Sequence, residues 1–451
     1  MTRAGRPTRL RLHPNDGVPM TALHTLTLAD VLRDHARSWP DRTAAVCDDA
    51  RLTWPQLDER VSRLANLLSG HGTGPGDRVL WLGQNCHRLV EGLLACAKIG
   101  AVFCPANWRQ SADELAYVIT DSAPRVVIWQ DEEVGEAVRA AREIAGGDAV
   151  WIQHDAGADD SAGYEAALAA TPADDPDHDV DGADPVMMMY TAAFEGRPRG
   201  ALLSHAGLLH QGLAIALIQG IDPGYTYLNC GPLFHIATFM TTFATFHLGG
   251  TNVFTRRADA EEILRLIVEE RCNGAFLLHP TVQKMGELNA DGQYDLSSLV
   301  TMKMGVPGFD EHISQASTPW IRKPGGYGQT EATGLVTYTA FADGGGFSSG
   351  RSSPVAIVRI VDEDGNEAPV GETGEIVVRG PIAMVGYHGA DEVTAERQRG
   401  GWHHTHDIGR RETDGSVTFV GPKTKLIKTG AENVYPAEVE ACLTRHPRVH
   451  R

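Results

Sequence analysis

The chain has 451 residues, 42% of them hydrophobic, and is therefore long and apolar enough to bury several cores. Fifty-eight acidic residues against 40 basic ones give a formal net charge of −18, which argues against a nucleic-acid-binding surface, because such surfaces need clustered Lys and Arg. The seven cysteines lack the paired spacings of zinc sites or redox dithiols, so the reducing cytoplasm is the expected compartment.

The amino-terminal segment is polar and basic. Residues 1–20 lack the apolar centre of a signal peptide, and we expect them to form a disordered leader. Elsewhere no uninterrupted apolar run approaches the roughly 20 residues that cross a bilayer. The sequence therefore predicts a protein without a transmembrane segment.

Helices and short apolar strands alternate after the leader. Residues 26–129 show this alternation, which is typical of βα units on a largely parallel sheet, and residues 186–304 repeat it. The segment between them, residues 154–185, is rich in Asp, Ala, Gly and Pro, so we expect a surface connection with one short helix at 164–169. The main predicted helices are 61–68 and 89–99, and the predicted strands are 78–82, 126–129, 186–190, 226–230 and 274–278.

Beyond residue 330 the pattern changes to short β-strands separated by turns. Strands are expected at 356–361, 374–379 and 414–420, which predicts a small antiparallel β-subdomain. The predicted fold class is therefore α/β, with two doubly wound subdomains and this β-subdomain making up one large domain over residues 21–421. After it, residues 425–428 and a predicted helix at 437–443 begin a further segment.

Two motifs carry most of the chemical information. Residues 325–331 read Gly-Gly-Tyr-Gly-Gln-Thr-Glu, and residues 402–407 read Trp-His-His-Thr-His-Asp. Together with the pattern from residue 27 to residue 440, these motifs resemble the AMP-forming acyl-CoA synthetases (fatty-acid–CoA ligases) of the adenylate-forming enzyme superfamily. The resemblance covers nearly the whole chain. It implies that residues 422–451 are the hinge and first part of a mobile carboxy-terminal domain, most of which is lacking.

The resemblance implies a site for ATP. Asp407 would accept hydrogen bonds from both ribose hydroxyls, which suits a carboxylate; an Asp that caps a turn is the alternative. Tyr327 would stack on adenine, and Glu331 would bind Mg²⁺, because magnesium prefers hard oxygen ligands. The other implied nucleotide contacts are the backbone at Gly326, Gly328 and Gln329, the hydroxyl of Thr330 near the α-phosphate, and an adenine wall of Gly305, Val306 and Pro307.

The loop that should hold the triphosphate departs from the family pattern. Within residues 191–200 Thr191 alone keeps a hydroxyl, and Arg199 stands where a lysine is usual. Glu195 is an unexpected acid, because a carboxylate about 4 Å from a phosphate charge costs about 4 kcal/mol at an effective dielectric near 20. It must point away, join the magnesium site or mark a weakened phosphate site. Its neighbours Ala192, Ala193 and Phe194 also replace usual hydroxyl-bearing residues.

Residues near the hinge differ from the family too. Pro422 stands where relatives use an Arg that also holds the ribose, and Thr424 stands where Asp or Lys is usual. Lys428 resembles a lysine that relatives use near the thioester-forming conformation. A surface lysine at the end of a strand is the alternative interpretation.

Residues 232–237, Pro-Leu-Phe-His-Ile-Ala, resemble the start of the helix that borders the acyl pocket. His235 would lie close to the reacting carboxylate. The alternative is a core histidine whose ring nitrogens are hydrogen-bonded within the protein. No Asp stands nearby to pair with an α-ammonium group. An apolar acid, typically a fatty acid, is therefore the expected substrate, and the sequence does not specify its chain length. An apolar tunnel, or equally a core, would be formed by Phe239, Met240, Phe243, Phe246 and Leu335.

The implied reaction joins the acid to ATP, releases pyrophosphate and transfers the acyl group from AMP to coenzyme A. Thr191, Arg199, His235 and Glu331 are the expected catalytic residues. Two alternatives stay open: a nucleotide-binding homologue with weak or lost catalysis, and an acyl- or amino-acid-adenylating enzyme that loads a carrier protein. Relatives supply a further catalytic lysine from beyond the position of Arg451, so we expect this chain to form acyl-CoA slowly or not at all. A homodimer stays an open expectation.

Overall fold

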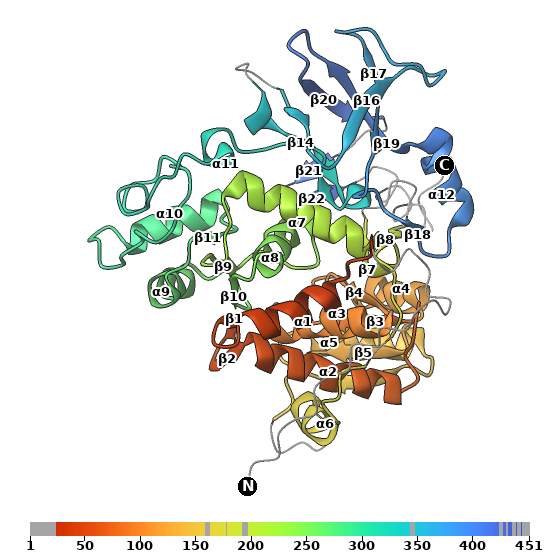
Figure 1. The fold of residues 1–451 in the computed structure, drawn as a ribbon, viewed down its shortest axis with the longest axis vertical. Helices are drawn as coiled ribbons and strands as arrows, with labels where there is room; N and C mark the ends of the chain where they lie inside the picture. Colours follow the sequence, from red (N-terminus) through yellow and green to blue (C-terminus); the bar gives the residue numbers. More distant parts are fainter. Residues whose placement is uncertain are drawn as a thin grey trace, which may run out of the picture.

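The computed structural model describes residues 24–157, 163–176, 178–191, 197–342, 348–423, 427–429 and 432–434, with the single positions 439 and 443. The expected leader, the loop residues Ala192 to Gly196, the hinge residue Thr424 and nearly all of the helix expected at 437–443 lie outside the described residues. Figure 1 shows an α/β body in its lower and middle parts and an antiparallel sheet above α7 (His205–Gln219). The predicted α/β fold class is confirmed.

The larger sheet in the described part of the chain is mostly parallel. Only its β7–β8 and β8–β18 pairs are antiparallel. From edge to edge its strands are β18 (Gly386–Tyr387), β8 (Gly200–Ser204), β7 (Pro185–Tyr190), β4 (Val102–Pro105), β3 (Arg78–Leu82), β5 (Val126–Trp129) and β6 (Val150–Gln153).

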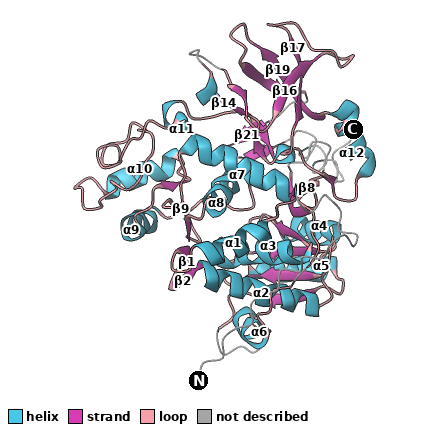
Figure 2. Cartoon of the chain, in the orientation of Figure 1, coloured by secondary structure: helices cyan, strands magenta, loops and turns pink. Residues whose placement is uncertain are grey.

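Helices cover both faces of this sheet, as the colouring in Figure 2 makes visible. Successive side chains of a strand point to opposite faces, and β3 shows the result: Val79 and Trp81 belong to one buried cluster, and Leu80 and Leu82 to another. The first face packs on α1 (Leu28–Ser38), α2 (Trp54–Gly70) and α3 (His87–Ile99), and the second on α4 (Ala112–Ser122) and α5 (Gly135–Ala145).

A second, smaller sheet lies beside the first and is also covered on both faces. Cys47 shares a buried cluster with Phe239 of α8 (Ile236–His247), whereas Val46 packs with Ile263 of α9 (Ala260–Glu270) and Met285 of α10 (His279–Leu288). Its strands, in spatial order, are β11 (Gly274–Ala275), β9 (Thr226–Asn229), β10 (Thr251–Phe254), β1 (Thr43–Cys47) and β2 (Ala50–Thr53).

The two sheets interleave along the chain, which corrects the predicted division into residues 26–129 and 186–304. Strand β1 comes from the first stretch but pairs with β10, with Ala45 opposite Asn252. Conversely β7 comes from the second stretch but pairs with β4, with Phe103 opposite Met187. Periodicity shows that a segment is a strand. It does not show with which strand the segment pairs, because crossovers between parallel strands have no set length.

The predicted antiparallel β-subdomain is confirmed. Its strands are β16 (Ile357–Val361), β17 (Thr373–Arg379), β19 (His403–Arg411) and β20 (Val417–Pro422), hydrogen-bonded in that order. The shorter described elements are α6 (Tyr164–Ala170), β12 (Gly328–Gln329), η2 (Thr330–Ala332), β13 (Gly334–Leu335), β14 (Thr337–Tyr338), η3 (Thr339–Phe341), β15 (Arg351–Ser352), α11 (Pro319–Arg322), α12 (Asp391–Arg397), η4 (Arg399–Gly401), β21 (Ile427–Thr429) and β22 (Glu432–Val434).

One predicted strand is much shorter than expected. The strand at 274–278 ends at Ala275, and Leu278, which is 47% exposed, instead precedes α10. A proline at the second position of α10, Pro280, favours a helix start there. Within the described residues, no helix combines the length and apolarity needed to span a membrane.

Candidate active site

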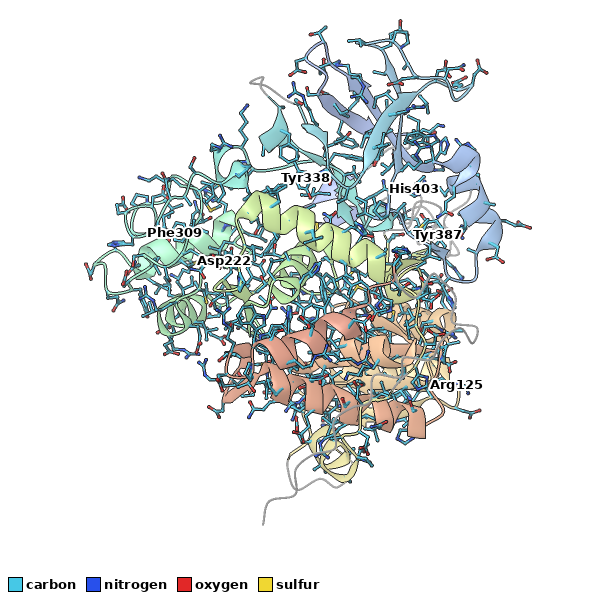
Figure 3. The ribbon with its side chains drawn as sticks, viewed as in Figure 1. Arg125, Asp222, Phe309, Tyr338, Tyr387 and His403 are labelled. Carbon is cyan, nitrogen blue, oxygen red and sulfur yellow. The ribbon has the colours of Figure 1, made fainter. Side chains whose placement is uncertain are left out.

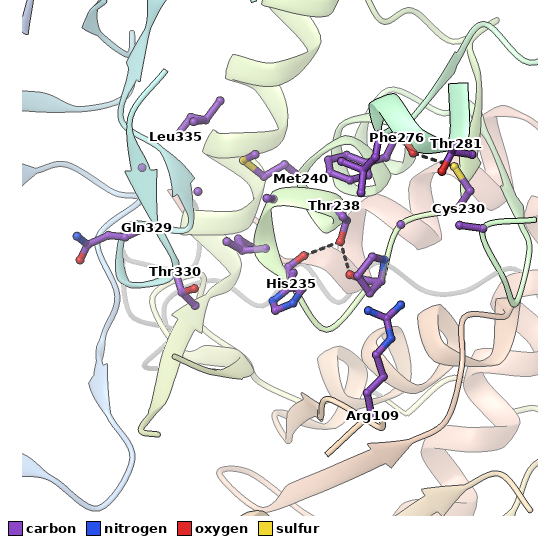
Figure 4. A pocket seen from close by; sticks show the side chains of 18 of the residues that line it. Arg109, Cys230, His235, Thr238, Met240, Phe276, Thr281, Gln329, Thr330 and Leu335 are labelled. Atoms are coloured by element: carbon purple, nitrogen blue, oxygen red, sulfur yellow. Dashed lines mark hydrogen bonds between the residues drawn. The ribbon is translucent and has the colours of Figure 1, made fainter. Parts of the chain in front are cut away.

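A cavity of about 370 Å³ lies where the second sheet, α8 and the segment around residue 330 meet (Figure 4). Four of the predicted site residues line it: His235, Gly328, Gln329 and Thr330. The other lining residues are mostly apolar: Arg109, Cys230, Gly231, Pro232, Ile236, Ala237, Thr238, Met240, Ala258, Ile263, Phe276, Leu278, Thr281, Gly334 and Leu335.

His235 stands at the amino-terminal cap of α8, and the loop before it is tightly held. Asn85, which is 6% exposed, donates to the Gly231 carbonyl at 2.7 Å and accepts from the Leu233 amide at 3.1 Å. The Thr238 hydroxyl donates to the Pro232 and His235 carbonyls. These bonds hold the loop whose His235 lines the cavity, and the place of this residue beside the reacting carboxylate stays a prediction.

The expected apolar tunnel is only partly formed. Met240 and Leu335 line the cavity. In contrast Phe239 and Phe243 stack on each other with ring centroids 4.5 Å apart, and they belong with Phe246 to the main core. Three of the five residues expected to form the tunnel therefore pack in the core. This was the alternative interpretation of their helical spacing.

Asp407 and Tyr327 bind each other. The Tyr327 hydroxyl donates to Asp407 Oδ2 at 2.6 Å, and burial together with this carboxylate raises the pKa of Tyr327. Asp407 lies within β19, so the interpretation as a turn cap is wrong. Its register partner on β20 is Pro422, the residue that replaces an expected ribose-binding Arg.

Gln329 extends this hydrogen-bond network. Its Nε2 donates to the Tyr327 hydroxyl at 3.1 Å, and its Oε1 lies 2.9 Å from His403 Nε2. Burial, helped by the nearby Arg397, lowers the pKa of His403 to about 3, so this ring is neutral at pH 7. A neutral ring with its proton on Nε2 donates to the Gln329 oxygen. The network fixes the two motifs against each other.

The Tyr327 ring packs against Phe419, with centroids 5.5 Å apart and planes 18° apart, and only 7% of the residue is exposed. One face of the ring is thus covered within the antiparallel-sheet core. Stacking on adenine would need the opposite face. The assignment of Tyr327 to adenine stays a prediction.

Glu331 lies in η2 and is 2% exposed. Its Oε1 accepts from the Tyr387 hydroxyl at 2.8 Å and lies 3.7 Å from Arg397 Nη2. Arg397 is 3% exposed and also approaches the Tyr387 hydroxyl at 3.3 Å. Figure 3 shows Tyr387 and His403 near each other beside α12, the helix that ends at Arg397. The expected metal ligand therefore already faces a buried cation.

The remaining predicted residues lie apart from the cavity lining. The Thr191 amide donates to the Arg199 carbonyl at 2.9 Å, which joins the two ends of the segment predicted to bind phosphate. The Asp310 carboxylate accepts from the amides of Gly305 and Val306 and so shapes the segment that ends at Pro307. Lys428 lies in β21, and its side chain is outside the described atoms.

Sequence reasoning missed Arg109, Asn85 and Arg397. Arg109 and Asn85 follow β4 and β3, at the carboxyl ends of parallel strands, where ligands of α/β proteins usually bind. That rule was the available signal for both residues. Arg397 shows no such signal, because its place next to Glu331 depends on the packing of α12.

Comparison with known proteins agrees with this geometry. A family model described as AMP-binding enzyme matches residues 32–388. A feruloyl-CoA synthase of Amycolatopsis sp is 35% identical over 418 residues, which cover 92% of this chain and 82% of that protein. A fatty acid–acyl-carrier-protein ligase, ScoC of Streptomyces coeruleorubidus, is 31% identical over 440 residues, covering 94% and 82%. The chain belongs to the AMP-binding enzyme family of adenylate-forming acid–CoA ligases.

A solved structure extends the comparison to three dimensions. The inhibitor-bound N-terminal domain of FACL13 from Mycobacterium tuberculosis is similar with a TM-score of 0.75 at 26% identity, covering 88% of this chain and 99% of that one. The arrangement of the sheets is therefore that of the N-terminal domain of adenylate-forming enzymes.

Proposed function

We propose that this protein activates an apolar carboxylic acid with ATP and transfers the acyl group to coenzyme A. The observation that carries the proposal is the largely apolar cavity with His235 and Thr330 on its lining. The acid would occupy the apolar part and present its carboxylate to the end formed by these two residues, where the α-phosphate would meet it. The names of the relatives support both aromatic and fatty acids as substrate classes.

We assign the nucleotide to the residues around Tyr327 and Asp407. The ribose would bind Asp407, the base would lie along residues 326–329 and the 305–307 segment, and Thr191, Arg199 and Lys428 would act on the phosphate and thioester side. This division makes residues 21–421 the nucleotide- and acid-binding domain and residues 422–451 a hinge segment. We also propose that the enzyme acts in the cytoplasm.

Magnesium is expected as the partner of the triphosphate, whose charge it neutralises when bound. Among the described residues no cluster of three or more His, Cys, Asp or Glu side chains could hold a metal. Glu331 is a hard oxygen donor next to the cavity-lining Thr330. It would fit as one metal ligand once the Arg397 side chain moves away from it. Phosphate oxygens and water would complete the coordination.

The test is pyrophosphate release by the purified chain with a panel of carboxylic acids, followed by an acceptor assay with coenzyme A and with a phosphopantetheine carrier protein. We expect slow acid-dependent release and slow transfer to coenzyme A. ATP binding without release for any acid would instead favour a nucleotide-binding homologue. Transfer only to the carrier would favour the second candidate, which the similarity to ScoC supports.

A further inference from the structure

The carboxyl end of β7 is bound to helix α4 just before Thr191. Tyr190 is the last residue of this strand, and its hydroxyl donates to Asp121 Oδ2 at 2.7 Å. Asp121 lies in the last turn of α4. Burial raises the pKa of Tyr190, so the hydroxyl keeps its proton at neutral pH and remains a hydrogen-bond donor. This bond fixes the backbone at the residue that precedes Thr191.

The same helix also holds the chain just before Arg199. The Tyr117 hydroxyl donates at 2.9 Å to the Pro198 carbonyl, which belongs to the peptide bond leading into Arg199. The Tyr117 oxygen also lies 3.4 Å from Asp121 Oδ1, but a hydroxyl has one proton, and the shorter bond uses it. The guanidinium of Arg197 lies over the Tyr117 ring, with Cζ 5.3 Å from the centroid. Tyr117 therefore contacts two successive residues of this segment.

Thr191 and Arg199 are joined to each other as well. The Thr191 amide donates to the Arg199 carbonyl at 2.9 Å, beside the pairing of Tyr190 with Gly200 between β7 and β8. These backbone bonds hold the two strand ends together, and the bonds to α4 hold both of them against the rest of the domain. Phosphate groups need donors at fixed positions, and donors that are ordered in advance bind at a lower entropy cost.

We propose that Tyr117 and Asp121 are positioning residues for the phosphates of ATP, because they hold Thr191 and Arg199 in the arrangement that binds phosphate before the nucleotide arrives. The inference rests on the proposed function, which takes Thr191 and Arg199 as residues on the phosphate side. Without the bonds to α4, part of the free protein would hold these two residues in other arrangements. The apparent affinity for ATP falls in proportion to the fraction that remains competent.

The test measures the binding of ATP and of adenosine to the full chain by isothermal titration calorimetry. Adenosine has the base and the ribose of ATP but no phosphate. Tyr117→Phe removes the bond to Pro198 and keeps the ring beneath Arg197, and Tyr190→Phe removes the bond to Asp121. Each variant should bind ATP roughly fivefold more weakly, the size of one hydrogen bond, and should bind adenosine as the parent protein does.

Tyr164→Phe is the matched control. The Tyr164 hydroxyl donates to Glu91 Oε2 at 2.7 Å, and the residue is fully buried, so this variant also loses a bond between a tyrosine and a carboxylate. Tyr164 belongs to the cluster on the opposite face of the large sheet from Tyr117 and Tyr190. The control should lower the free energy of unfolding and leave both affinities unchanged.

Equal losses of ATP and adenosine affinity, or no loss in either Tyr117→Phe or Tyr190→Phe, would overturn the inference and leave the proposed nucleotide site intact. Failure of the parent protein to bind ATP would overturn the proposed function and the inference with it. If Tyr190→Phe does not fold, Tyr117→Phe decides alone, because Tyr117 is only partly buried and keeps its ring.

Discussion

The Tyr327 hydroxyl donates a 2.6 Å hydrogen bond to Asp407 Oδ2, across 80 positions of sequence. This bond joins the two motifs on which the family resemblance rests. It also holds the carboxylate in place before a nucleotide arrives. An interaction partner fixed in advance costs less ordering entropy on binding.

Asp407 is expected to hold the ribose. Asp407→Ala should weaken ATP binding by about 2–4 kcal/mol, the range for truncating one side of a charge-assisted contact. Isothermal titration calorimetry measures the change. Tyr327→Phe is the companion variant: it removes the hydrogen bond but keeps the carboxylate, so its loss of ATP affinity should be smaller. Unchanged ATP affinity in folded Asp407→Ala would show that the ribose binds elsewhere.

Arg397 and a metal ion should compete for Glu331. Arg397→Gln leaves a carboxylate that is 2% exposed without its cation, so the free energy of unfolding should fall by about 3 kcal/mol without metal. In the presence of ATP, the affinity for Mn²⁺, followed by electron paramagnetic resonance, should rise.

Arg399→Gln is the matched control for this variant. Arg399 pairs with Glu375 and Glu396, not with Glu331. Its loss should leave the metal affinity as it was. A metal affinity that does not respond to Arg397→Gln would mean that Glu331 is not a metal ligand.

Gly334→Ala should obstruct the cavity. The added β-carbon would overlap the Met240 side chain, and the φ of 118° is unfavourable for alanine. We expect the KM for the acid to rise at least tenfold while ATP affinity changes little. Gly371→Ala separates obstruction from backbone strain, because Gly371 has a φ of 89° but nothing within 4 Å of the added atom. Equal kinetic effects of both variants would count against the obstruction.

His154 should make the fold sensitive to acid. The ring stacks on Trp81 with centroids 4.4 Å apart, neither ring nitrogen has a partner among the described residues, and burial lowers the pKa of His154 from 6.5 to about 3. Between these values the unfolded chain binds the proton and the folded chain does not, so stability rises with pH. This group alone should remove about 2 kcal/mol of unfolding free energy between pH 7 and pH 5.

Denaturant unfolding at the two pH values measures this effect. His154→Leu should flatten the pH dependence by that amount, whatever it costs at pH 7. The control His71→Ala changes an exposed histidine and should leave the slope intact. A slope unchanged in His154→Leu would assign the acid sensitivity to other buried histidines.

Sequence patterns predicted the elements themselves well. Periodicity identified strands such as Arg78–Leu82 and Val126–Trp129 and the helix Tyr164–Ala170, because a strand or helix needs its apolar residues at local, readable intervals. The motifs around Tyr327 and Asp407 indicated the family, since close approach of a backbone and a carboxylate at a fixed position need particular residue types. The confirmed α/β class follows from those local requirements.

Tertiary structure alone decided which elements and side chains meet. The pairing of β1 with β10 and of β4 with β7 joins segments that no local pattern connects. The same holds for Arg397 beside Glu331 and for Tyr117 beside Pro198: an arginine or tyrosine on a helix looks alike in sequence whether it faces water or another part of the chain. Helical spacing also could not separate Met240, which packs in the core and lines the cavity as well, from Phe239, which packs in the same core but is not part of the cavity lining. Both places require an apolar residue, and only packing in three dimensions distinguishes them.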